Sequence, residues 1–386
     1  MNTNLILQNV VLNKKIPGIV AIAANGDGVI YQGAFGKRRI DADISMTLDT
    51  VFWIASMTKP ITSVAALQLV EKGKLQLDEP ISQVIPELKA VQVLEGFDSG
   101  GRPKLRATKR PITLRHLLTH TSGYTFNTWN NDMLRYTEWA NIPSILEGKD
   151  RTINTPLVFD PGERWEYGIS TEWVGKAVEA ASGYSLSKYV KEYVCNPIGM
   201  NDTEFILRPD LRSRLAGMHQ RQPNGELSVI PPYEAPQGSE LFSAGGGLYS
   251  TAIDYIKFLQ TLLHDGSFNG TRILQPESVE QMGINQIGDL NVALMRSVVP
   301  SRSNDVDFFP GLVKKWSLGH MITTEEATTG RSAGSLAWAG SANTYYWIDP
   351  VKRLTGVFFT QLNPFMDETV LQAFAKFETE IYDSCK

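Results

Sequence analysis

Both ends of the chain carry the sequence pattern of a β-hairpin, and this pairing constrains the fold more than any other feature. Residues 19–24 and 29–35 are apolar-rich runs joined by Asn25-Gly26-Asp27-Gly28, which is a strong signal for a hairpin turn. Near the other end, residues 345–348 and 354–362 form a second pair of such runs around a proline-containing turn. Strands at both termini with flanking helices predict one antiparallel sheet built from both ends of the chain.

Helical patterns flank this sheet and dominate the middle of the chain. An amphipathic helix is predicted over residues 5–12, and a second one over 367–382 closes the sequence. Helical patterns in the middle cover residues 114–120, 136–146, 171–182 and 185–195. These patterns predict an α+β fold in which helices flank the antiparallel sheet and a mostly helical domain is inserted into it.

The predicted fold has two parts with the active site between them. Residues 1–75 and 235–386 form the sheet domain, and residues 76–234 form the inserted helical domain. The basic residues between Arg102 and Arg110 have no aromatic residues interleaved with them, so we predict a solvated loop there and not a nucleic-acid site.

Charge and cysteine content exclude several classes of protein. The net charge of −4 over 386 residues predicts no attraction to nucleic acid or to an anionic membrane. Cys195 and Cys385 form neither a disulfide framework nor a zinc motif, and no apolar run approaches membrane-spanning length. Because no basic region precedes the N-terminal apolar residues, a signal peptide is not predicted. We therefore expect a cytoplasmic protein.

A serine and a lysine at the start of a predicted helix are the first candidates for catalysis. Apolar residues recur at helical spacing from Ile61 onwards, and Pro60 is tolerated only in the first turn of a helix, so the helix begins at about Ser56 or Met57. Lys59 then lies one turn after Ser56 on the same face. A hydroxyl at the positive end of a helix beside an amine suits nucleophilic catalysis, although an N-cap serine and a solvated lysine would give the same pattern.

Tyr167 is a second candidate. After a turn at Pro161-Gly162 the sequence alternates, which places Trp165 and Tyr167 on one side of a strand, and a helix follows from Thr171. A phenol at such a strand-to-helix junction can point into a cleft, but a half-buried structural aromatic is the common alternative.

A strand of small residues is predicted over residues 336–342. Such a strand allows close approach of a substrate to its backbone, as an oxyanion hole requires. Packing of the strand against a helix is the alternative.

Taken together, four motifs resemble the serine β-lactamase-related superfamily. Their order and spacing are similar to those of class C β-lactamases, D-aminopeptidases and, most nearly, family VIII carboxylesterases. The resemblance covers nearly the whole chain and implies the β-lactamase/penicillin-binding-protein fold. The motifs are Ser56-Met57-Thr58-Lys59, Leu117-Leu118-Thr119-His120-Thr121-Ser122-Gly123, Asp160-Pro161-Gly162-Glu163 leading to Tyr167, and Gly245-Gly246-Gly247-Leu248-Tyr249-Ser250-Thr251-Ala252.

This resemblance implies a role for each matching residue. Ser56 is the expected nucleophile, Lys59 its proton partner and Tyr167 a second acid/base group. The backbone N–H groups of Ser56 and Ser341 are expected to form the oxyanion hole.

Two departures from the β-lactamase motifs bear on the substrate. The Tyr-x-Asn motif becomes Tyr167-Gly168-Ile169, and the Lys-Thr-Gly motif becomes Trp338-Ala339-Gly340. The groups that hold an antibiotic are therefore missing, and an indole at this place is typical of the esterase branch. We predict a cleft for neutral or hydrophobic esters whose substrate-binding residues are Tyr124, Phe126, Trp129, Ile169, Trp338 and Gly340.

The predicted function is a serine carboxylesterase that hydrolyses short-chain or hydrophobic esters through an acyl-Ser56 intermediate. Three enzymatic alternatives use the same residues: an acyltransferase of the statin-biosynthesis type, a D-amino-acid peptidase and a weak β-lactamase. A non-catalytic sensor or binding module of the penicillin-binding type is a fourth. We expect a small-molecule ester as partner and no cofactor, and homo-oligomer formation stays open.

Two other motifs are set aside. Gly330-Arg331-Ser332-Ala333-Gly334 matches the nucleophile elbow of α/β-hydrolases, but a small-residue strand follows it and no histidine lies beyond His320. His116 and His120 have the helical spacing of a metal pair but lack a third ligand, so no metal is predicted.

Overall fold

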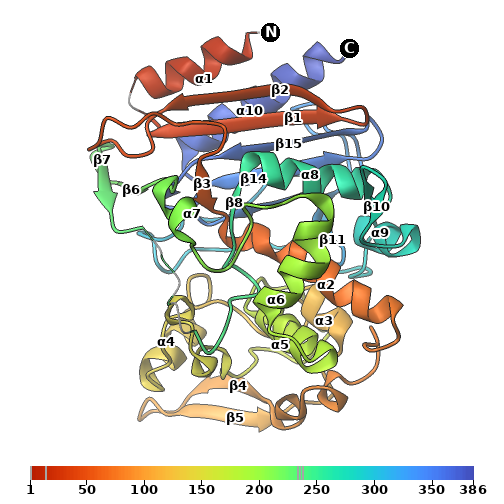
Figure 1. Cartoon of the computed structure of the whole chain (residues 1–386). Helices are drawn as coiled ribbons and strands as arrows, with labels where there is room; N and C mark the ends of the chain where they lie inside the picture. The colour runs from red at the N-terminus through yellow and green to blue at the C-terminus, as the bar shows by residue number, and fades with distance from the viewer. Residues whose placement is uncertain (1, 14, 233, 235, 237–238) are drawn as a thin grey trace.

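A seven-stranded antiparallel sheet joins the two ends of the chain (Figure 1). The computed structural model describes residues 2–13, 15–232, 234, 236 and 239–386. The strand order is β11-β12-β13-β14-β15-β1-β2. The N-terminal hairpin joins the C-terminal strands through the β1–β15 pair, in which Val20 lies opposite Phe359. The predicted α+β fold with a sheet built from both termini is confirmed.

Both predicted hairpins match strands of this sheet. Its members are β1 (Gly18–Asn25), β2 (Val29–Gly36), β11 (Lys314–Trp316), β12 (Met321–Thr323), β13 (Leu336–Gly340), β14 (Thr344–Asp349) and β15 (Leu354–Phe359).

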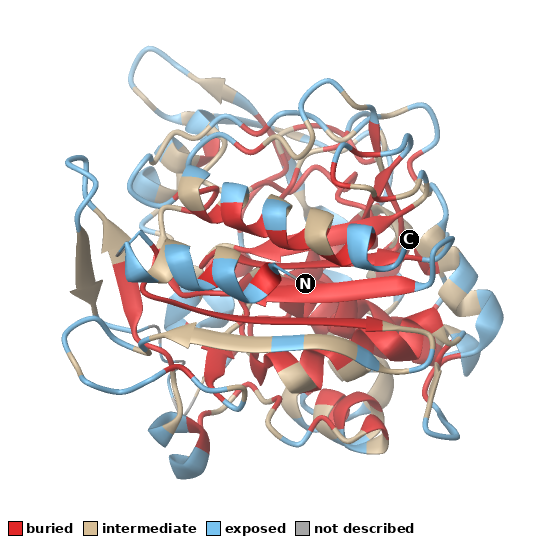
Figure 2. Ribbon diagram, turned by 90° about the horizontal axis from the view of Figure 1, so that it is seen from above, coloured by how far each residue is buried: buried red, intermediate tan, exposed pale blue. Residues whose placement is uncertain are grey.

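Helices cover the two faces of the sheet. Adjacent residues of a strand point to opposite faces, and Tyr345 stacks on Phe374 of α10 (Glu368–Ser384), whereas Tyr346 contacts Tyr255 of α8 (Ala252–Leu263). Helix α1 (Thr3–Leu12) lies beside α10. Seen from above, the central strands are buried and the outer sides of the covering helices are exposed (Figure 2). The sheet and its inner helix faces therefore form the main core.

The second half of the molecule contains most of the remaining helices and lies below the sheet in Figure 1. Helix α2 runs between the halves and packs against α5. The elements are α2 (Thr58–Glu71), α3 (Leu114–Leu118), α4 (Asn131–Trp139), α5 (Ser170–Ser182), α6 (Leu186–Val190) and a one-turn π-helix (Lys191–Cys195). Among the described residues, no helix is both long and apolar enough to cross a membrane.

Shorter strands and helices complete the fold. Strand β16 pairs with β6, so part of the segment predicted as inserted pairs with the C-terminal region. These elements are β3 (Val51–Trp53) with β8 (Tyr249–Thr251), β6 (Met218–Arg221), β7 (Leu227–Ile230), β16 (Leu362–Asn363), β9 (Ser267–Phe268), β10 (Thr271–Arg272), α7 (Pro209–Ser213) and α9 (Pro276–Gly283). Single 3₁₀ turns cover Ala55–Met57, Ile81–Gln83, Pro86–Ala90, Ile145–Glu147, Asp150–Ile153 and Asn196–Ile198.

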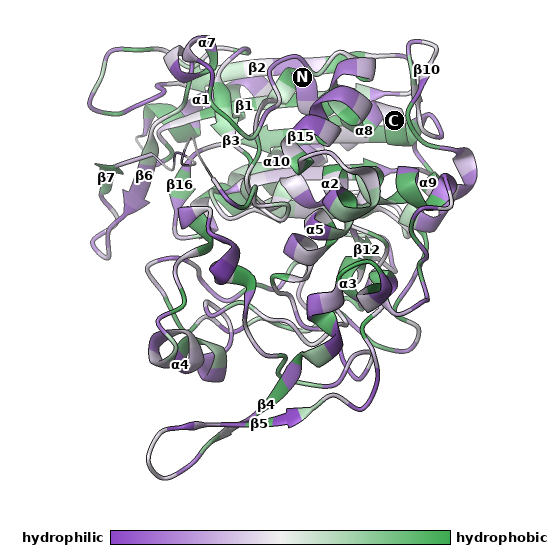
Figure 3. Cartoon of the chain, turned by 60° about the horizontal axis from the view of Figure 1, so that its bottom comes forward, coloured by the Kyte–Doolittle hydropathy of each residue, from purple (hydrophilic) through white to green (hydrophobic). Residues whose placement is uncertain are grey.

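The prediction of a solvated loop for the basic segment between Arg102 and Arg110 is wrong in part. Strand β5 (Pro103–Ala107) pairs with β4 (Gln92–Phe97), and this hairpin protrudes at the bottom of Figures 1 and 3. Arg106 donates to both carboxylate oxygens of buried Asp160, at 3.0 and 2.7 Å. This bidentate contact ties the hairpin to the segment before Tyr167.

Two local predictions also need correction. The helix predicted over 136–146 is α4, which begins at Asn131 because the Asn130 side chain caps it through the Met133 N–H at 2.9 Å. It ends before Asn141, which has a left-handed φ of 50°. The strand predicted around Tyr167 is an extended segment without sheet pairing, although Trp165 and Tyr167 share a buried side as predicted.

Candidate active site

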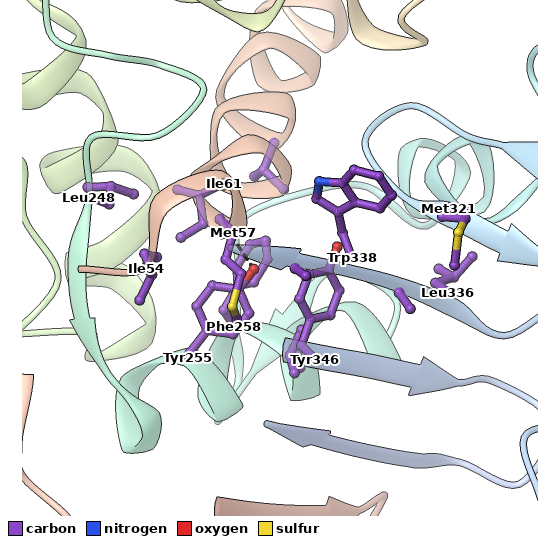
Figure 4. Packing of buried hydrophobic residues seen from close by; sticks show 14 of the residues in the cluster. Ile54, Met57, Ile61, Leu248, Tyr255, Phe258, Met321, Leu336, Trp338 and Tyr346 are labelled. Atoms are coloured by element: carbon purple, nitrogen blue, oxygen red, sulfur yellow. Dashed lines mark hydrogen bonds between the residues drawn. The ribbon is translucent and has the colours of Figure 1, made fainter. Parts of the chain in front are cut away.

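Ser56 lies in a tight turn between strand β3 and helix α2. Ala55, just before it, has a φ of +44°, a left-handed conformation that is costly for a residue with a Cβ. Ile54 and Met57 on either side of this turn are buried, and the Tyr255 hydroxyl of α8 donates to the Met57 carbonyl at 2.9 Å (Figure 4). Packing therefore fixes the turn, and α2 begins two residues after Ser56, close to the predicted start.

Lys59 is one turn further along and points back at Ser56. Its Nζ donates to Ser56 Oγ at 3.1 Å and to the Gly245 carbonyl at 2.7 Å. The side chain is only 2% exposed. Burial lowers the pKa of Lys59 to about 7, while the negative charge of Glu172 acts to raise it. An amine with this pKa can both hold and release a proton near neutral pH.

Tyr167 completes the cluster. The Lys59 ammonium lies 4.7 Å from its ring centroid. Burial raises the pKa of the Tyr167 phenol, and hydrogen bonds with Ser56 and Trp338 act in the opposite direction. The Trp338 indole Nε1 donates to the phenol oxygen at 3.1 Å, a contact that stabilises phenolate more than phenol.

Gly168 sets the position of Tyr167. A Cβ at Gly168 would lie 2.2 Å from the Tyr124 carbonyl oxygen, so only glycine permits this close approach of the two backbone segments. The Gly168 N–H donates to His120 Nδ1 at 3.4 Å, and the Glu166 N–H donates to the His120 carbonyl at 3.0 Å. The segment that carries Tyr167 is therefore held on both sides.

His120 and Glu172 are site residues that the sequence did not reveal. The His120 ring lies 4.6 Å from that of Tyr167, and burial, helped by the nearby Lys59 charge, holds its pKa well below the usual range. His120 is therefore neutral at physiological pH. It belongs to the quoted Leu117–Gly123 motif, but nothing in the local pattern places its ring against Tyr167. Glu172 lies in the first turn of α5, where one acidic residue is common.

A cavity of about 990 Å³ opens beside Ser56. Ser56, Ile169, Glu172 and Ser341 line it together with side chains from both halves of the molecule. Its apolar wall includes Phe126, Trp129, Leu134, Ile145, Val299 and Phe365. Three of the predicted substrate-binding residues, namely Phe126, Trp129 and Ile169, thus face this space.

The other three predicted substrate-binding residues do not line the cavity. Tyr124 is buried and stacks on Trp173, with ring centroids 6.1 Å apart. Trp338 lies behind Tyr167, with which it hydrogen-bonds. A Cβ at Gly340 would lie 2.3 Å from the Ile54 carbonyl oxygen, so this glycine allows β13 to pack against the segment before Ser56. These three residues support the site from outside the cavity wall.

Of the residues set aside in the sequence, His120 lies in this cluster, whereas His116 and Ser332 lie outside it. The His116 Nδ1 accepts from the Thr113 N–H in a capping box at the start of α3. The Ser332 N–H donates to Asp349 Oδ2 in a loop. Within the described part of the chain, no group of three or more His, Cys, Asp or Glu side chains is arranged to hold a metal ion.

A hydroxyl, a buried amine of lowered pKa and a phenol meet at the edge of a large cavity whose wall is apolar in its greater part. This arrangement can carry out acyl transfer through a serine ester, with the amine and the phenol moving the proton. Fold and site together define a serine enzyme of the β-lactamase type. The beta-lactamase family model matches residues 6–380, and the chain belongs to this family. The predicted membership of the serine β-lactamase superfamily is confirmed.

The relatives of this chain include acyltransferases and an esterase. The monacolin J acid methylbutanoyltransferase of Aspergillus terreus is 34% identical, over 96% of this chain and 93% of that protein. The lovastatin esterase of Penicillium rubens is 31% identical, over 89% and 88%. The unliganded structure of simvastatin synthase from Aspergillus terreus has a TM-score of 0.86 and 32% identity, over 99% of this chain and 97% of that chain. The chain is therefore an enzyme, and the alternative of a non-catalytic module falls away.

Proposed function

We propose that this enzyme is a serine acyltransferase, which moves a short acyl group onto the hydroxyl of a bulky apolar acceptor, with hydrolysis as the competing outcome. The cavity beside Ser56 carries this proposal. At about 990 Å³ it is at the upper end of the range for small-molecule sites, roughly 300–1,000 Å³. A short acyl group alone would leave most of this space to water.

The composition of the wall favours an apolar acceptor. Side chains from α4 and the following turn, such as Leu134 and Ile145, line the space opposite Val299 and Phe365. A bulky apolar molecule would bury its surface against these side chains and exclude water from Ser56, which favours transfer over hydrolysis. The relatives named as a methylbutanoyltransferase and as simvastatin synthase support the same choice, and the lovastatin esterase supports hydrolysis as the second candidate. The plain esterase predicted from the sequence thus becomes the secondary activity.

The proposed reaction has two halves. Ser56 Oγ attacks the carbonyl carbon of the acyl donor, its proton passes to Lys59 or Tyr167, and the donor alcohol or thiol leaves with that proton. The acceptor hydroxyl then attacks the carbonyl carbon of acyl-Ser56 and gives its proton to the same pair. The bond from that carbon to Ser56 Oγ breaks, Ser56 Oγ takes the proton back, and the new ester leaves. Backbone N–H groups of Ser56 and Ser341 would hold the oxyanion in both halves.

The electrostatics support shared proton transfer by Lys59 and Tyr167. Burial lowers the pKa of Lys59 to about 7, so the free amine is available at neutral pH. The Ser56 and Trp338 hydrogen bonds to the phenol oppose the effect of burial on Tyr167. In the proposed reaction Lys59 takes the Ser56 proton as the free amine, and Tyr167, hydrogen-bonded to Ser56, passes it on.

The test compares product distribution with and without an acceptor. The enzyme is incubated with p-nitrophenyl butyrate, alone and with monacolin J acid, and butyrate and butyryl ester are measured by mass spectrometry. We expect the ester to become the main product as acceptor concentration rises, with the butyryl group mapped to Ser56 during turnover. Small alcohols such as methanol serve as the matched control for acceptor size. Release of butyrate alone at every acceptor concentration would establish a plain esterase.

A further inference from the structure

We propose that Glu172 is a positioning residue of this site: acting across Gly245, its carboxylate holds Lys59 in place and balances the charge of the Lys59 ammonium. This inference rests on the proposed acyl-Ser56 chemistry and extends it to Glu172, which lies outside the four motifs quoted from the sequence.

The contacts of Gly245 connect the two side chains. The Gly245 N–H donates to Glu172 Oε1 at 3.1 Å, and the Gly245 carbonyl accepts from Lys59 Nζ at 2.7 Å. A Cβ at Gly245 would lie 2.8 Å from Glu172 Oε1 and 3.2 Å from Lys59 Nζ. Gly245 is therefore the single residue that separates the two side chains, and any larger residue would push them apart.

Glu172 is held firmly but is only partly satisfied. It is 1% exposed, and Oε1 also accepts from Ser243 Oγ at 2.9 Å. The other oxygen, Oε2, is buried and has no hydrogen-bond partner among the described residues. Glu172 also lines the cavity that contains Ser56. A buried carboxylate with a free oxygen costs folding free energy, so a purely structural role would be better filled by a neutral side chain.

The charge of Glu172 has a defined target. Lys59 is buried and has no direct ion pair among the described residues, and the negative charge that acts on it is that of Glu172. Burial raises the pKa of Glu172, while the Lys59 charge and the hydrogen bonds from Ser243 and Gly245 act to lower it. The positive end of α5 likewise favours the ionised form. The other titratable groups that face the pair are Tyr167, on the segment before α5, and His120, after α3. His120 is neutral, so Lys59 and Glu172 balance each other.

The experiment measures the pH dependence of Ser56 labelling by a fluorophosphonate, read by mass spectrometry. A negative charge stabilises the ammonium, so its removal in Glu172→Gln lowers the pKa of Lys59. The limb of the profile that reports Lys59 should therefore move to lower pH by roughly one unit, the lower end of the range for a nearby opposite charge. Glutamine can still accept from Gly245 and Ser243, so the backbone contacts are retained.

Two further variants separate charge from structure. Glu172→Asp keeps the charge and should return the limb towards its wild-type position. Glu179→Gln, on the same helix seven residues later, is the matched control, because Glu179 accepts from the Leu186 N–H outside the cavity. Its profile should equal that of the wild type. Thermal denaturation gives the folded fraction of each variant, and the labelling rate is divided by this fraction. Partial unfolding of a variant therefore does not obscure the result.

Each outcome decides between the claims. Slower labelling of Glu172→Gln with an unmoved limb would show a merely structural role and overturn the inference, as would a profile equal to that of the wild type. If wild-type Ser56 is not labelled at all, the proposed acyl-enzyme chemistry fails first, independently of Glu172.

Discussion

The indole N–H of Trp338 offers the sharpest test of the proposed proton transfer. Trp338→Phe keeps an aromatic ring behind Tyr167 but removes the donor that contacts the phenol oxygen at 3.1 Å. This donor stabilises the phenolate more than the phenol, so its loss raises the pKa of Tyr167 and leaves less phenolate available to accept the Ser56 proton. We therefore expect slower acylation without any change in the residues that contact the acyl group.

The size of the effect follows from the contact. A hydrogen bond to a charged group is worth about 1.5–3 kcal/mol. At about 1.4 kcal/mol per factor of ten, its loss should reduce kcat/KM by roughly ten- to a hundredfold. The assay is the p-nitrophenol burst from p-nitrophenyl butyrate, and the ratio of kcat/KM values gives the lost transition-state stabilisation.

Trp316→Phe is the matched control. Trp316 belongs to the same aromatic cluster, with its ring centroid 4.7 Å from that of Trp338. Its Nε1 donates to the Leu118 carbonyl at 3.2 Å. The control therefore removes a buried indole donor of the same kind, and should lower the melting temperature while leaving kcat/KM within about threefold of wild type. In a Tyr167→Phe background, Trp338→Phe should add little, because its target is already gone. Equal losses in both variants, or an undiminished loss in the Tyr167→Phe background, would refute the reasoning.

Three further predictions concern the nucleophile, the packing behind it and the substrate. Ser56→Ala should abolish labelling by an activated ester while Ser332→Ala, in a loop outside the site, keeps it; the reverse pattern in peptide mapping would reassign the nucleophile. Gly340→Ala places a Cβ 2.3 Å from the Ile54 carbonyl and should cost about 1–3 kcal/mol in urea unfolding, and an unchanged midpoint would contradict this packing. Specificity constants should be far higher for p-nitrophenyl butyrate than for a chromogenic cephalosporin, since the loss of two charge-assisted contacts costs about 3–6 kcal/mol; comparable values would argue for a lactamase.

Much of the fold is encoded in short stretches of sequence. The turn Asn25-Gly26-Asp27-Gly28 and the apolar runs around it specify the first hairpin, and β1 and β2 occupy these positions. Pro60 fixed the start of the catalytic helix to within two residues. These features depend on steric and hydrogen-bonding rules that act over a few neighbouring residues, so they can be inferred without knowing the rest of the chain.

The candidate catalytic residues were identified partly by residue type and spacing and partly by the resemblance to the β-lactamase superfamily. A serine and a lysine at i and i+3 on a helix must lie on one face, and the structure places their side chains 3.1 Å apart. Tyr167 was a candidate from its place before a helix, but its acid/base role came from the family motif, because its neighbours in sequence are also consistent with a structural aromatic. The strand β5 was missed because its charged residues look solvated until the Arg106–Asp160 contact is known.

Only the tertiary structure decided what surrounds these groups. Gly245 and Glu172 form a hydrogen bond although 73 positions separate them in the sequence. Trp338 and Tyr167 form another across a sequence separation of 171 positions. Burial, the pKa of Lys59 and the size of the cavity all depend on such long-range packing, which no local pattern records. The sequence by itself determined which residues can react and where the elements that carry them begin. The packing of the sheet half against the helical half decided the protonation of those residues, and how large a partner can reach Ser56.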